Sequence, residues 1–253
     1  MSVILEVNNL SIQFGGLKAV ENFQIEIGDN DLIGLIGPNG AGKTTVFNLL
    51  TGVYHPTNGE IIIDGNLITS KKPYQIARTG IARTFQNIRL FKDMSVIDNV
   101  KIAFHKNMKC SLFSSILRLP SYWKEEKKIT EKAYEMLKIF GLEDLADQIA
   151  DNLPYGQQRK LEIARALATS PKVLLLDEPA AGMNPTETQD LMNTIKFIRE
   201  KFNISILLIE HDMSLVMGIC EHIIVLDYGN IIATGTPAEV ASNKRVISAY
   251  LGE

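Results

Sequence analysis

Short runs of apolar residues alternate with polar turns along this chain, and two kinds of run predict two kinds of sheet. Residues 32–36, 173–176 and 204–209 are continuous apolar runs, which is typical of parallel strands buried on both faces. Near the start, residues 4–7 and 25–28 are shorter runs separated by turns. We therefore expect a mostly antiparallel front part that leads into a parallel sheet.

Hairpins are predicted at two places. Residues 60–68 contain Asp64-Gly65 between two apolar runs, and Asp-Gly favours the tight turns whose twist matches paired strands. Residues 223–234 hold a similar pair of runs. The sequence T-P-A-E that follows, from Thr236, offers a capping box with proline at the first helical position. A helix should begin there.

Helical spacing dominates the middle of the chain. Residues 74–80, 157–168 and 186–202 predict single helices, and residues 94–149 predict a helical block that forms a second lobe. Within that block two apolar stripes are expected to face the core: Ile129, Ala133, Met136, Leu137 and Phe140, then Leu142, Leu145, Ala146 and Ile149.

One segment of this block, residues 105–128, is harder to place. It carries many large apolar groups for a surface insertion: Phe113, Ile116, Leu117, Leu119, Tyr122 and Trp123. We favour a satellite core for these side chains, and the alternative is a surface for a membrane partner.

Composition excludes several classes of protein. The 253 residues are 45% hydrophobic, ample for one large core. Twenty-six Lys and Arg against 29 Asp and Glu give a formal net charge of −3, which is not the basic footprint of a nucleic-acid-binding protein. Cys110 and Cys220 do not suggest a disulfide framework and suit a reducing cytoplasm. There is no signal-peptide pattern and no apolar run of about 18 residues, so any membrane role should come through partners.

The strongest chemical signal is the pattern G-x-x-x-x-G-K-T, placed between an apolar run and a stretch with helical spacing. Its glycines let successive backbone N–H groups point at phosphate oxygens, and the following helix N-terminus favours negative charge. Lys43 adds a positive charge for the β- and γ-phosphates, and Thr44 offers a hydroxyl to Mg²⁺. The expected phosphate-binding residues are Gly37, Pro38, Asn39, Gly40, Ala41, Gly42, Lys43, Thr44 and Thr45.

Further polar residues lie at the ends of strand-like runs: Gln86 at the end of a strand expected over residues 81–86, then Asp177-Glu178, and His211. Ligands of open α/β sheets bind outside the carboxyl ends of the strands, so we expect these side chains to share one crevice with the phosphate loop. Asp177 suits a carboxylate that holds Mg²⁺, and Glu178 could orient or deprotonate the attacking water.

Each of these residues also has an ordinary interpretation. Adjacent acids are common in solvated turns, a lone histidine usually satisfies a local hydrogen bond, and a loop glutamine is often merely exposed. With the phosphate loop present, we favour His211 as a contact of the γ-phosphate or of the water, and Gln86 as a ligand of metal or water. Phe14 precedes two glycines and could stack on adenine, although a lone aromatic ring is more often part of a core.

In order and approximate spacing, these elements resemble the ATP-binding subunits of ABC transporters over nearly the whole chain. The loop from Gly37 to Thr44 corresponds to Walker A, Gln86 to the Q-loop, Asp177 to the end of Walker B and His211 to the switch histidine. Closer still, the chain is similar to the ATP-binding subunits of bacterial branched-chain (hydrophobic) amino-acid importers. The segments that carry this likeness are 83–87, 152–159, 161–165, 177–185, 209–213 and 249–253.

The resemblance implies an ABC ATPase fold: a P-loop NTPase core with a parallel sheet, an antiparallel β subdomain and an inserted α-helical subdomain. Residues 1–253 would form this single domain, with 1–86 and 157–253 in the core and β subdomain and about 87–156 in the helical subdomain. The catalytic set would be Lys43, Gln86, Glu178 and His211, and the Mg²⁺ ligands would be Thr44, Gln86 and Asp177.

ATP and Mg²⁺ are the implied cofactors, and the implied partners are further subunits of a transporter. A second ATPase subunit, identical or paralogous, would pair head to tail and receive the signature motif: Leu153, Tyr155, Gly156 and Gln157. Two integral membrane permease subunits, and indirectly a periplasmic or extracellular substrate-binding protein, complete the assembly at the cytoplasmic face of the membrane. No nucleic acid is expected. A short permease helix would dock on the helical lobe near Arg89, Leu90, Phe91 and Met94.

Two residues depart from the family pattern. Pro154 stands where the signature L-S-G-G-Q has serine, and proline lacks both the hydroxyl and an N–H. Asn184 stands where the D-loop usually has aspartate. Both positions bear on the contact between subunits, so the two ATP sites could be unequal.

Other functions remain open at this point. The transporter could be an exporter or a lipid-extraction system. A soluble ABC ATPase of translation or DNA repair usually has two cassettes, long coiled coils or basic surfaces, which this sequence lacks. A regulatory nucleotide binder without turnover is suggested only by Pro154 and Asn184.

Overall fold

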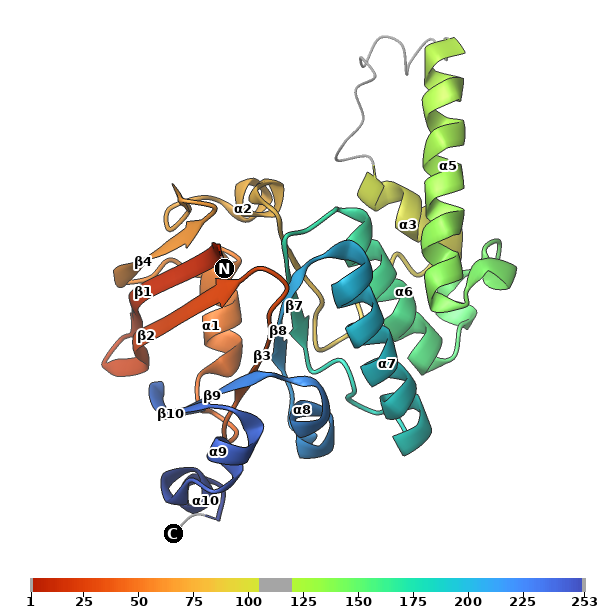
Figure 1. Cartoon of the computed structure of the whole chain (residues 1–253). Coiled ribbons are helices and arrows are strands. Elements are labelled where there is room, and N and C mark those ends of the chain that lie inside the picture. Colours follow the sequence, from red (N-terminus) through yellow and green to blue (C-terminus); the bar gives the residue numbers. More distant parts are fainter. Residues whose placement is uncertain (1, 105–119, 252–253) are drawn as a thin grey trace. The chain divides into compact units, whose positions relative to one another are not determined.

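The computed structural model describes residues 2–104 and 120–251 of the chain (Figure 1). The chain forms two compact units. The first comprises residues 1–86 together with 172–253, and the second comprises residues 87–171.

The first unit contains a six-stranded sheet with strand order β10-β9-β3-β8-β7-β6. Neighbouring strands are parallel from β9 to β6, and β10 is antiparallel to β9. The three continuous apolar runs form β3, β8 and β7, whose residues are all buried, as predicted. The strands are β3 (Leu32–Ile36), β6 (Ile81–Arg83), β7 (Val173–Asp177), β8 (Ser205–Ile209), β9 (His222–Asp227) and β10 (Asn230–Gly235).

The register of this sheet brings three strand ends to one edge. Asp177 at the end of β7 is paired with Ile209 at the end of β8, and Ile209 is paired with Leu35 of β3. The expected strand over residues 81–86 is too long, because β6 ends at Arg83. Residues 84–86 leave the sheet beside the strand ends, where their side chains can reach the acidic pair.

A second, antiparallel sheet of the first unit has the order β2-β1-β4-β5 and confirms the predicted front part and hairpin. Its first two strands are longer than the apolar runs indicated. Asn9 and Asn22 have positive φ angles of 50°, and the β1–β2 register shifts around them, so these bulges interrupt the apolar alternation. The strands are β1 (Val3–Phe14), β2 (Leu17–Gly28), β4 (Asn58–Ile63) and β5 (Asn66–Leu67).

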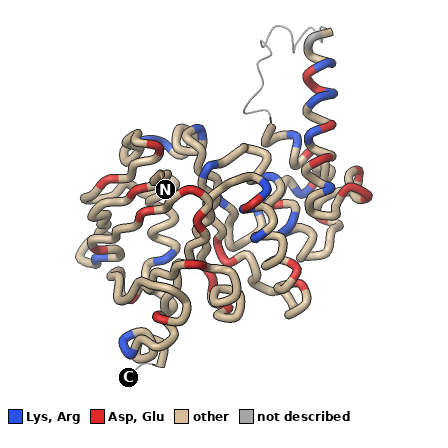
Figure 2. The backbone as a smooth tube through the Cα atoms, viewed as in Figure 1, with Lys and Arg blue, Asp and Glu red and all other residues tan. Residues whose placement is uncertain are grey.

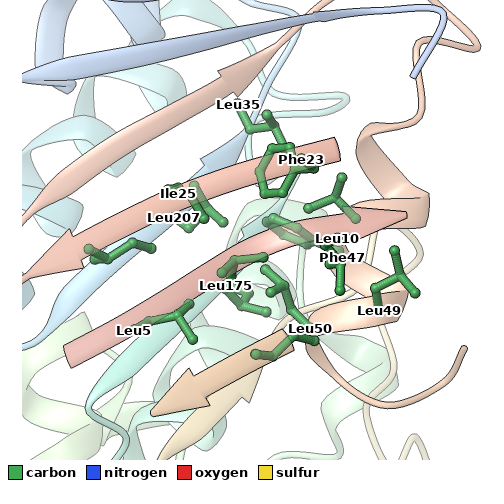
Figure 3. Close-up of a cluster of buried hydrophobic side chains, with 14 of the residues drawn as sticks. Leu5, Leu10, Phe23, Ile25, Leu35, Phe47, Leu49, Leu50, Leu175 and Leu207 are labelled. Carbon is green, nitrogen blue, oxygen red and sulfur yellow. The ribbon is translucent and has the colours of Figure 1, made fainter. Parts of the chain in front are cut away.

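Helix α1 (Lys43–Leu50) packs between side chains of the two sheets (Figure 3). Phe47 of α1 is fully buried in a cluster with Leu10 of β1, Phe23 of β2 and Leu175 of β7. This burial fixes the N-terminal end of α1, and therefore the phosphate loop, at the edge where the parallel strands end.

Predicted signals mark two boundaries among the remaining helices of the first unit, whereas the helices over residues 213–219 and 244–251 were not predicted. Thr236 accepts a hydrogen bond from the Glu239 N–H in the predicted capping box, and Gly80 ends its helix with a φ of 110°. The helices are α2 (Pro73–Thr79), α7 (Pro185–Phe202), α8 (Met213–Ile219), α9 (Pro237–Ala241) and α10 (Lys244–Leu251).

The second unit is helical, with α3 (Val96–Phe104), α5 (Pro120–Phe140) and α6 (Tyr155–Ala168). Helix α6 packs against α3 and α5. The expected end of the helical subdomain at residue 156 is therefore too early, because all of α6 belongs to this unit. Lys, Arg, Asp and Glu are interspersed along α5 (Figure 2), which leaves its apolar stripe to face the other two helices.

The two predicted stripes of the second unit have different outcomes. The first is confirmed: Ile129, Ala133, Met136, Leu137 and Phe140 are buried. The second is wrong as a helix face, because the segment consists of short 3₁₀ turns at Glu143–Leu145 and Ala150–Asn152. Leu142 and Ala146 are buried there, whereas Ile149 is exposed and forms an isolated bridge with Ser95.

The satellite core expected for residues 105–128 lies mostly outside the described residues, which resume at residue 120. Phe113, Ile116, Leu117 and Leu119 belong to that part, as does Cys110. Of the described members, Tyr122 is half-buried and Trp123 is 55% exposed, so Trp123 is not a core residue. Within residues 2–104 and 120–251, no helix is both long enough and apolar enough to cross a bilayer.

Candidate nucleotide site

The phosphate loop joins β3 to α1, and its backbone requires glycine at two positions. Gly37 and Gly42 have φ angles of 149° and 106°. A Cβ at Gly37 would lie 2.0 Å from the carbonyl oxygen of Leu226, and a Cβ at Gly42 would lie 2.7 Å from that of Ala19. The loop is therefore packed tightly against neighbouring backbone, and a side chain at either position would displace it.

Lys43 is the first residue of α1 and is 6% exposed. Its Nζ donates to the carbonyl oxygens of Gly37 at 2.7 Å and Pro38 at 3.0 Å. Burial lowers the pKa of Lys43, and the nearby charges of Glu178 and Asp177 oppose that shift. An anion bound in the loop would replace two neutral acceptors with a charged one, which favours a phosphate group.

An open cavity of about 740 Å³ lies over the loop. Gln86, Glu178 and His211 line it together with loop residues 39–45, so distant parts of the sequence meet at the expected crevice. Sequence reasoning missed its other walls, which come from the start of β2 and from the β9–β10 turn: Leu17, Lys18, Ala19 and Tyr228. The Tyr228-Gly229 turn was predicted only as a hairpin, although its Gly229 N–H donates to Ala41 of the loop at 2.9 Å.

Glu178 lies at the centre of the polar side of this cavity. Its Oε2 accepts a hydrogen bond from Nε2 of Gln86 at 2.7 Å, and its Oε1 lies 2.6 Å from Nε2 of His211. The residue has a φ of 47°, and its N–H donates to the carbonyl of Ile209 at 2.9 Å. A left-handed conformation is unfavourable for glutamate, so the sheet edge holds the side chain in place at some cost in backbone strain.

Asp177 precedes Glu178 and is 2% exposed. Its carboxylate pairs with Arg83, and its N–H donates to Oγ1 of Thr84 at 3.3 Å. Asp177, Thr44 and Gln86 all offer oxygen donors, which is the ligand type that Mg²⁺ prefers. The donor set therefore fits this ion in company with phosphate oxygens.

Glu210 is a buried acid that sequence reasoning did not single out. Its Oε1 accepts from the N–H of Ala180 at 2.6 Å, and its Oε2 accepts from the N–H of His211 at 2.9 Å. Burial raises the pKa of Glu210, opposed by these backbone hydrogen bonds. One carboxylate thus joins the loop after Glu178 to the loop that carries His211.

Phe14 does not line the cavity. Its ring is 45% exposed and packs edge to face on Tyr54, with centroids 5.2 Å apart. This arrangement leaves a ring surface near the start of the β1–β2 turn, and stacking on a base remains a hypothesis.

The signature segment lies in the second unit, where α6 begins at Tyr155. Leu153 is buried, Tyr155 is exposed, and Gly156 and Gln157 are half-buried. Pro154 is the N-cap of α6, and its carbonyl accepts from the N–H groups of Gln157 at 2.9 Å and Gln158 at 3.0 Å. The missing proline N–H costs this helix nothing, because an N-cap residue does not donate within the helix.

Asn184, the second departure, is the N-cap of α7. Its Oδ1 accepts from the N–H of Glu187 at 3.0 Å, and its own N–H donates to the Glu187 carboxylate at 3.0 Å. Asparagine and aspartate cap helices about equally well, so the departure is neutral for the fold.

The expected permease-docking residues follow the Q-loop in the second unit. Arg89 is held by α6: its N–H donates to Oε1 of Glu162 at 3.1 Å, and its carbonyl accepts from the guanidinium of Arg165. Phe91 is 48% exposed, with the Arg165 guanidinium 5.4 Å from its ring centroid. The helix that begins with the signature segment thus fixes the backbone of the expected docking segment.

Comparisons with known proteins agree with this geometry. A family model described as ABC transporter matches residues 20–181, and one described as Branched-chain amino acid ATP-binding cassette transporter matches residues 230–253. The chain is 49% identical over 250 residues to the High-affinity branched-chain amino acid transport ATP-binding protein LivG of Escherichia coli, covering 99% of this chain and 98% of LivG. It is 47% identical over 250 residues to BraF of Pseudomonas aeruginosa, which has the same description, with the same coverage.

A solved structure is similar over the whole chain. The ADP conformation of MJ1267, an ATP-binding cassette of an ABC transporter, matches with a TM-score of 0.86 and 34% sequence identity, covering 100% of both chains.

Proposed function

We infer the function from one premise: this chain belongs to the ATP-binding proteins of ABC transporters, of the branched-chain amino acid type. We propose that it hydrolyses ATP to ADP and phosphate and thereby energises the import of branched-chain or other hydrophobic amino acids through a membrane permease. The observation that carries this proposal is that the phosphate loop, Gln86, Glu178 and His211 line one common cavity.

The proposed roles follow from the positions of the side chains. Lys43 exchanges its carbonyl contacts for the β- and γ-phosphates. Phe14 does not line the cavity, and its proposed stacking on the adenine rests on its exposure beside the β1–β2 turn. Glu178 orients and deprotonates the attacking water, held between the amide of Gln86 and the ring of His211. His211 also contacts the γ-phosphate. Catalysis of this kind consists mainly of positioning and charge stabilisation.

Mg²⁺ is the proposed metal, held by Thr44, Gln86 and Asp177 together with phosphate oxygens. When bound, it neutralises charge on the phosphates. The chemistry of Gln86 supports this role, because an amide oxygen is the kind of donor that Mg²⁺ prefers, and the amide nitrogen donates to Glu178.

The proposed working unit is a head-to-tail dimer of ATPase subunits at the cytoplasmic face of the membrane. The chain carries one phosphate loop and one signature segment, so each ATP site would be closed by Leu153, Tyr155, Gly156 and Gln157 of the other subunit. Two membrane permease subunits, which receive the amino acid from a substrate-binding protein, would dock near Arg89, Leu90, Phe91 and Met94. The exposed ring of Phe91 supports that position.

Reconstitution with the membrane permease subunits and the second ATPase subunit of a branched-chain amino acid transporter from the same organism tests the proposal. We expect proteoliposomes with ATP inside to take up leucine, isoleucine or valine, given the substrate-binding protein outside, and to lose uptake with Lys43→Ala. ATP-dependent export would instead indicate the exporter function. Nucleotide binding without turnover in the complete assembly would indicate a regulatory subunit.

A further inference from the structure

Arg83, the last residue of β6, contacts the acidic end of β7. Its Nη2 lies 2.6 Å from Oδ2 of Asp177, and the two side chains are only 7% and 3% exposed. Such a pair is fully desolvated, so its attraction is little screened, and removing one partner would leave a buried charge without compensation.

The same guanidinium also contacts the helix that follows the phosphate loop. Its Nη1 lies 2.7 Å from Oδ1 of Asn48 on α1. Asn48 is four residues after Thr44, and residues at this spacing lie on the same face of a helix. Arg83 therefore connects the face of α1 that carries Thr44 to the carboxylate of Asp177.

Two aromatic rings hold the guanidinium in place. Its central carbon lies 5.4 Å from the ring centroid of Phe47 and 5.2 Å from that of Phe85. With two aromatic rings near the guanidinium and an oxygen acceptor on each of two nitrogens, the planar group has one favourable orientation. Lysine, a single mobile point charge, could not reproduce these contacts.

The neighbouring residue adds a contact at the backbone. Oγ1 of Thr84 accepts from the N–H of Asp177 at 3.3 Å, and the N–H of Thr84 donates to the carbonyl of Leu175 at 2.9 Å. Arg83 and Thr84 together thus contact both the side chain and the backbone of Asp177. The arginine pair uses Oδ2 of Asp177, so Oδ1 is the oxygen that a metal or its water would have to use.

We propose that Arg83 is a positioning residue of the magnesium site: it fixes the Asp177 carboxylate relative to α1 and so determines how strongly Mg²⁺ strengthens nucleotide binding. This inference rests on the proposed function, because it assigns the metal to Thr44 and Asp177. A positioning role and a purely electrostatic role of Arg83 predict opposite changes in Mg²⁺ binding when the arginine is replaced. A positive charge beside the site weakens cation binding, whereas a fixed ligand strengthens it.

The test measures nucleotide binding rather than turnover. The dissociation constant of a fluorescent ATP analogue is determined in excess EDTA and in saturating Mg²⁺. The constant in EDTA divided by the constant in Mg²⁺ is the factor by which Mg²⁺ strengthens binding. We expect Arg83→Met to lower this ratio about tenfold, and Arg83→Lys and Asn48→Ala to lower it about threefold. The constant in EDTA should change less than about twofold, because Arg83 does not contact the phosphate loop.

Arg199→Met is the matched control, since Arg199 pairs with Glu221 at 2.7 Å in the same unit, away from the cavity. It should leave the ratio unchanged. Retained binding in EDTA shows that each variant is folded, and Arg83→Lys and Asn48→Ala decide the question if Arg83→Met does not fold.

The outcomes separate this inference from the proposed function. A lower melting temperature with an unchanged ratio in all three variants would mean a merely structural ion pair and would overturn the inference. A higher ratio in Arg83→Met with an unchanged ratio in Arg83→Lys would also overturn it, in favour of simple electrostatics. An unmodified protein that binds no nucleotide, or binds it without any effect of Mg²⁺, would overturn the proposed function and this inference with it.

Discussion

The Nε2 atom of His211 lies 2.6 Å from Oε1 of Glu178, while the other oxygen of that carboxylate accepts from Gln86 at 2.7 Å. Both oxygens of the proposed base are therefore oriented by side chains from two other strand ends. A general base must be held within hydrogen-bonding reach of its proton, and this arrangement restricts Glu178 to one position in the cavity.

Replacing the carboxylate by its amide tests this role. Glu178→Gln should bind ATP normally but hydrolyse it at least about a hundredfold more slowly, because the amide cannot accept a proton. The unhydrolysed ATP should trap the dimer. Size-exclusion chromatography in ATP and Mg²⁺ would detect the dimer, and an assay of phosphate release would measure hydrolysis. Normal turnover by this variant would remove Glu178 from the proposed role.

The contact between His211 and Glu178 predicts that their contributions are not independent. His211→Ala should lower kcat, since Glu178 loses the partner of its Oε1. The double variant His211→Ala/Glu178→Gln should be no slower than the slower single variant, because residues that act as a unit give non-additive losses. Measuring kcat for the four proteins checks this, and losses that multiply would show that the two residues act separately.

Sequence reasoning identified those parts of the fold that depend on local pattern. The buried strands β3, β7 and β8 are uniformly apolar, and the Asp64-Gly65 turn and Thr236 cap have local signals. The full lengths of β1 and β2 could not be predicted, because bulges at Asn9 and Asn22 break the alternation that identifies a strand.

The candidate site shows the same division. The phosphate loop and the positions of Gln86, Glu178 and His211 near the ends of strands could be predicted from local sequence patterns. The pairing of Arg83 with Asp177 could not, because it joins residues 94 positions apart and depends on the sheet order and register. The left-handed backbone of Glu178 is a tertiary effect too, since glutamate gives no local signal for it.

Glu210 should matter for both stability and turnover. In Glu210→Gln, one carboxylate oxygen becomes an amide NH₂ that cannot accept from the backbone, so a buried N–H of Ala180 or His211 loses its acceptor. We expect the free energy of unfolding to fall by about 1–3 kcal/mol, and kcat to fall because the loop carrying His211 loosens. Urea unfolding and phosphate release measure the two effects. Glu221→Gln, which changes an exposed glutamate, is the control, and an equal effect there would contradict a specific role of Glu210.

The buried thiol of Cys220 predicts a loss of stability in alkali. Cys220 is 5% exposed, and burial raises its pKa from 9.0 to about 12, with a further contribution from Glu221. Because the thiol stays neutral in the folded protein but ionises in the unfolded chain, the stability present below pH 9 is lost as the pH rises toward 12. At pH 10 this loss is on the order of 1 kcal/mol.

Urea unfolding at pH 7.5 and pH 10 measures that loss, compared between Cys110→Ser and Cys110→Ser/Cys220→Ala. The other titrating groups are the same in both proteins, so their contributions cancel in the difference between the two pH dependences. The protein that retains Cys220 should lose more stability than the other, by on the order of 1 kcal/mol. Equal losses, or rapid reaction of the folded thiol with Ellman's reagent at pH 8, would mean that Cys220 is accessible to water, and the packing of Cys220 against Gly34 of β3 would then be wrong.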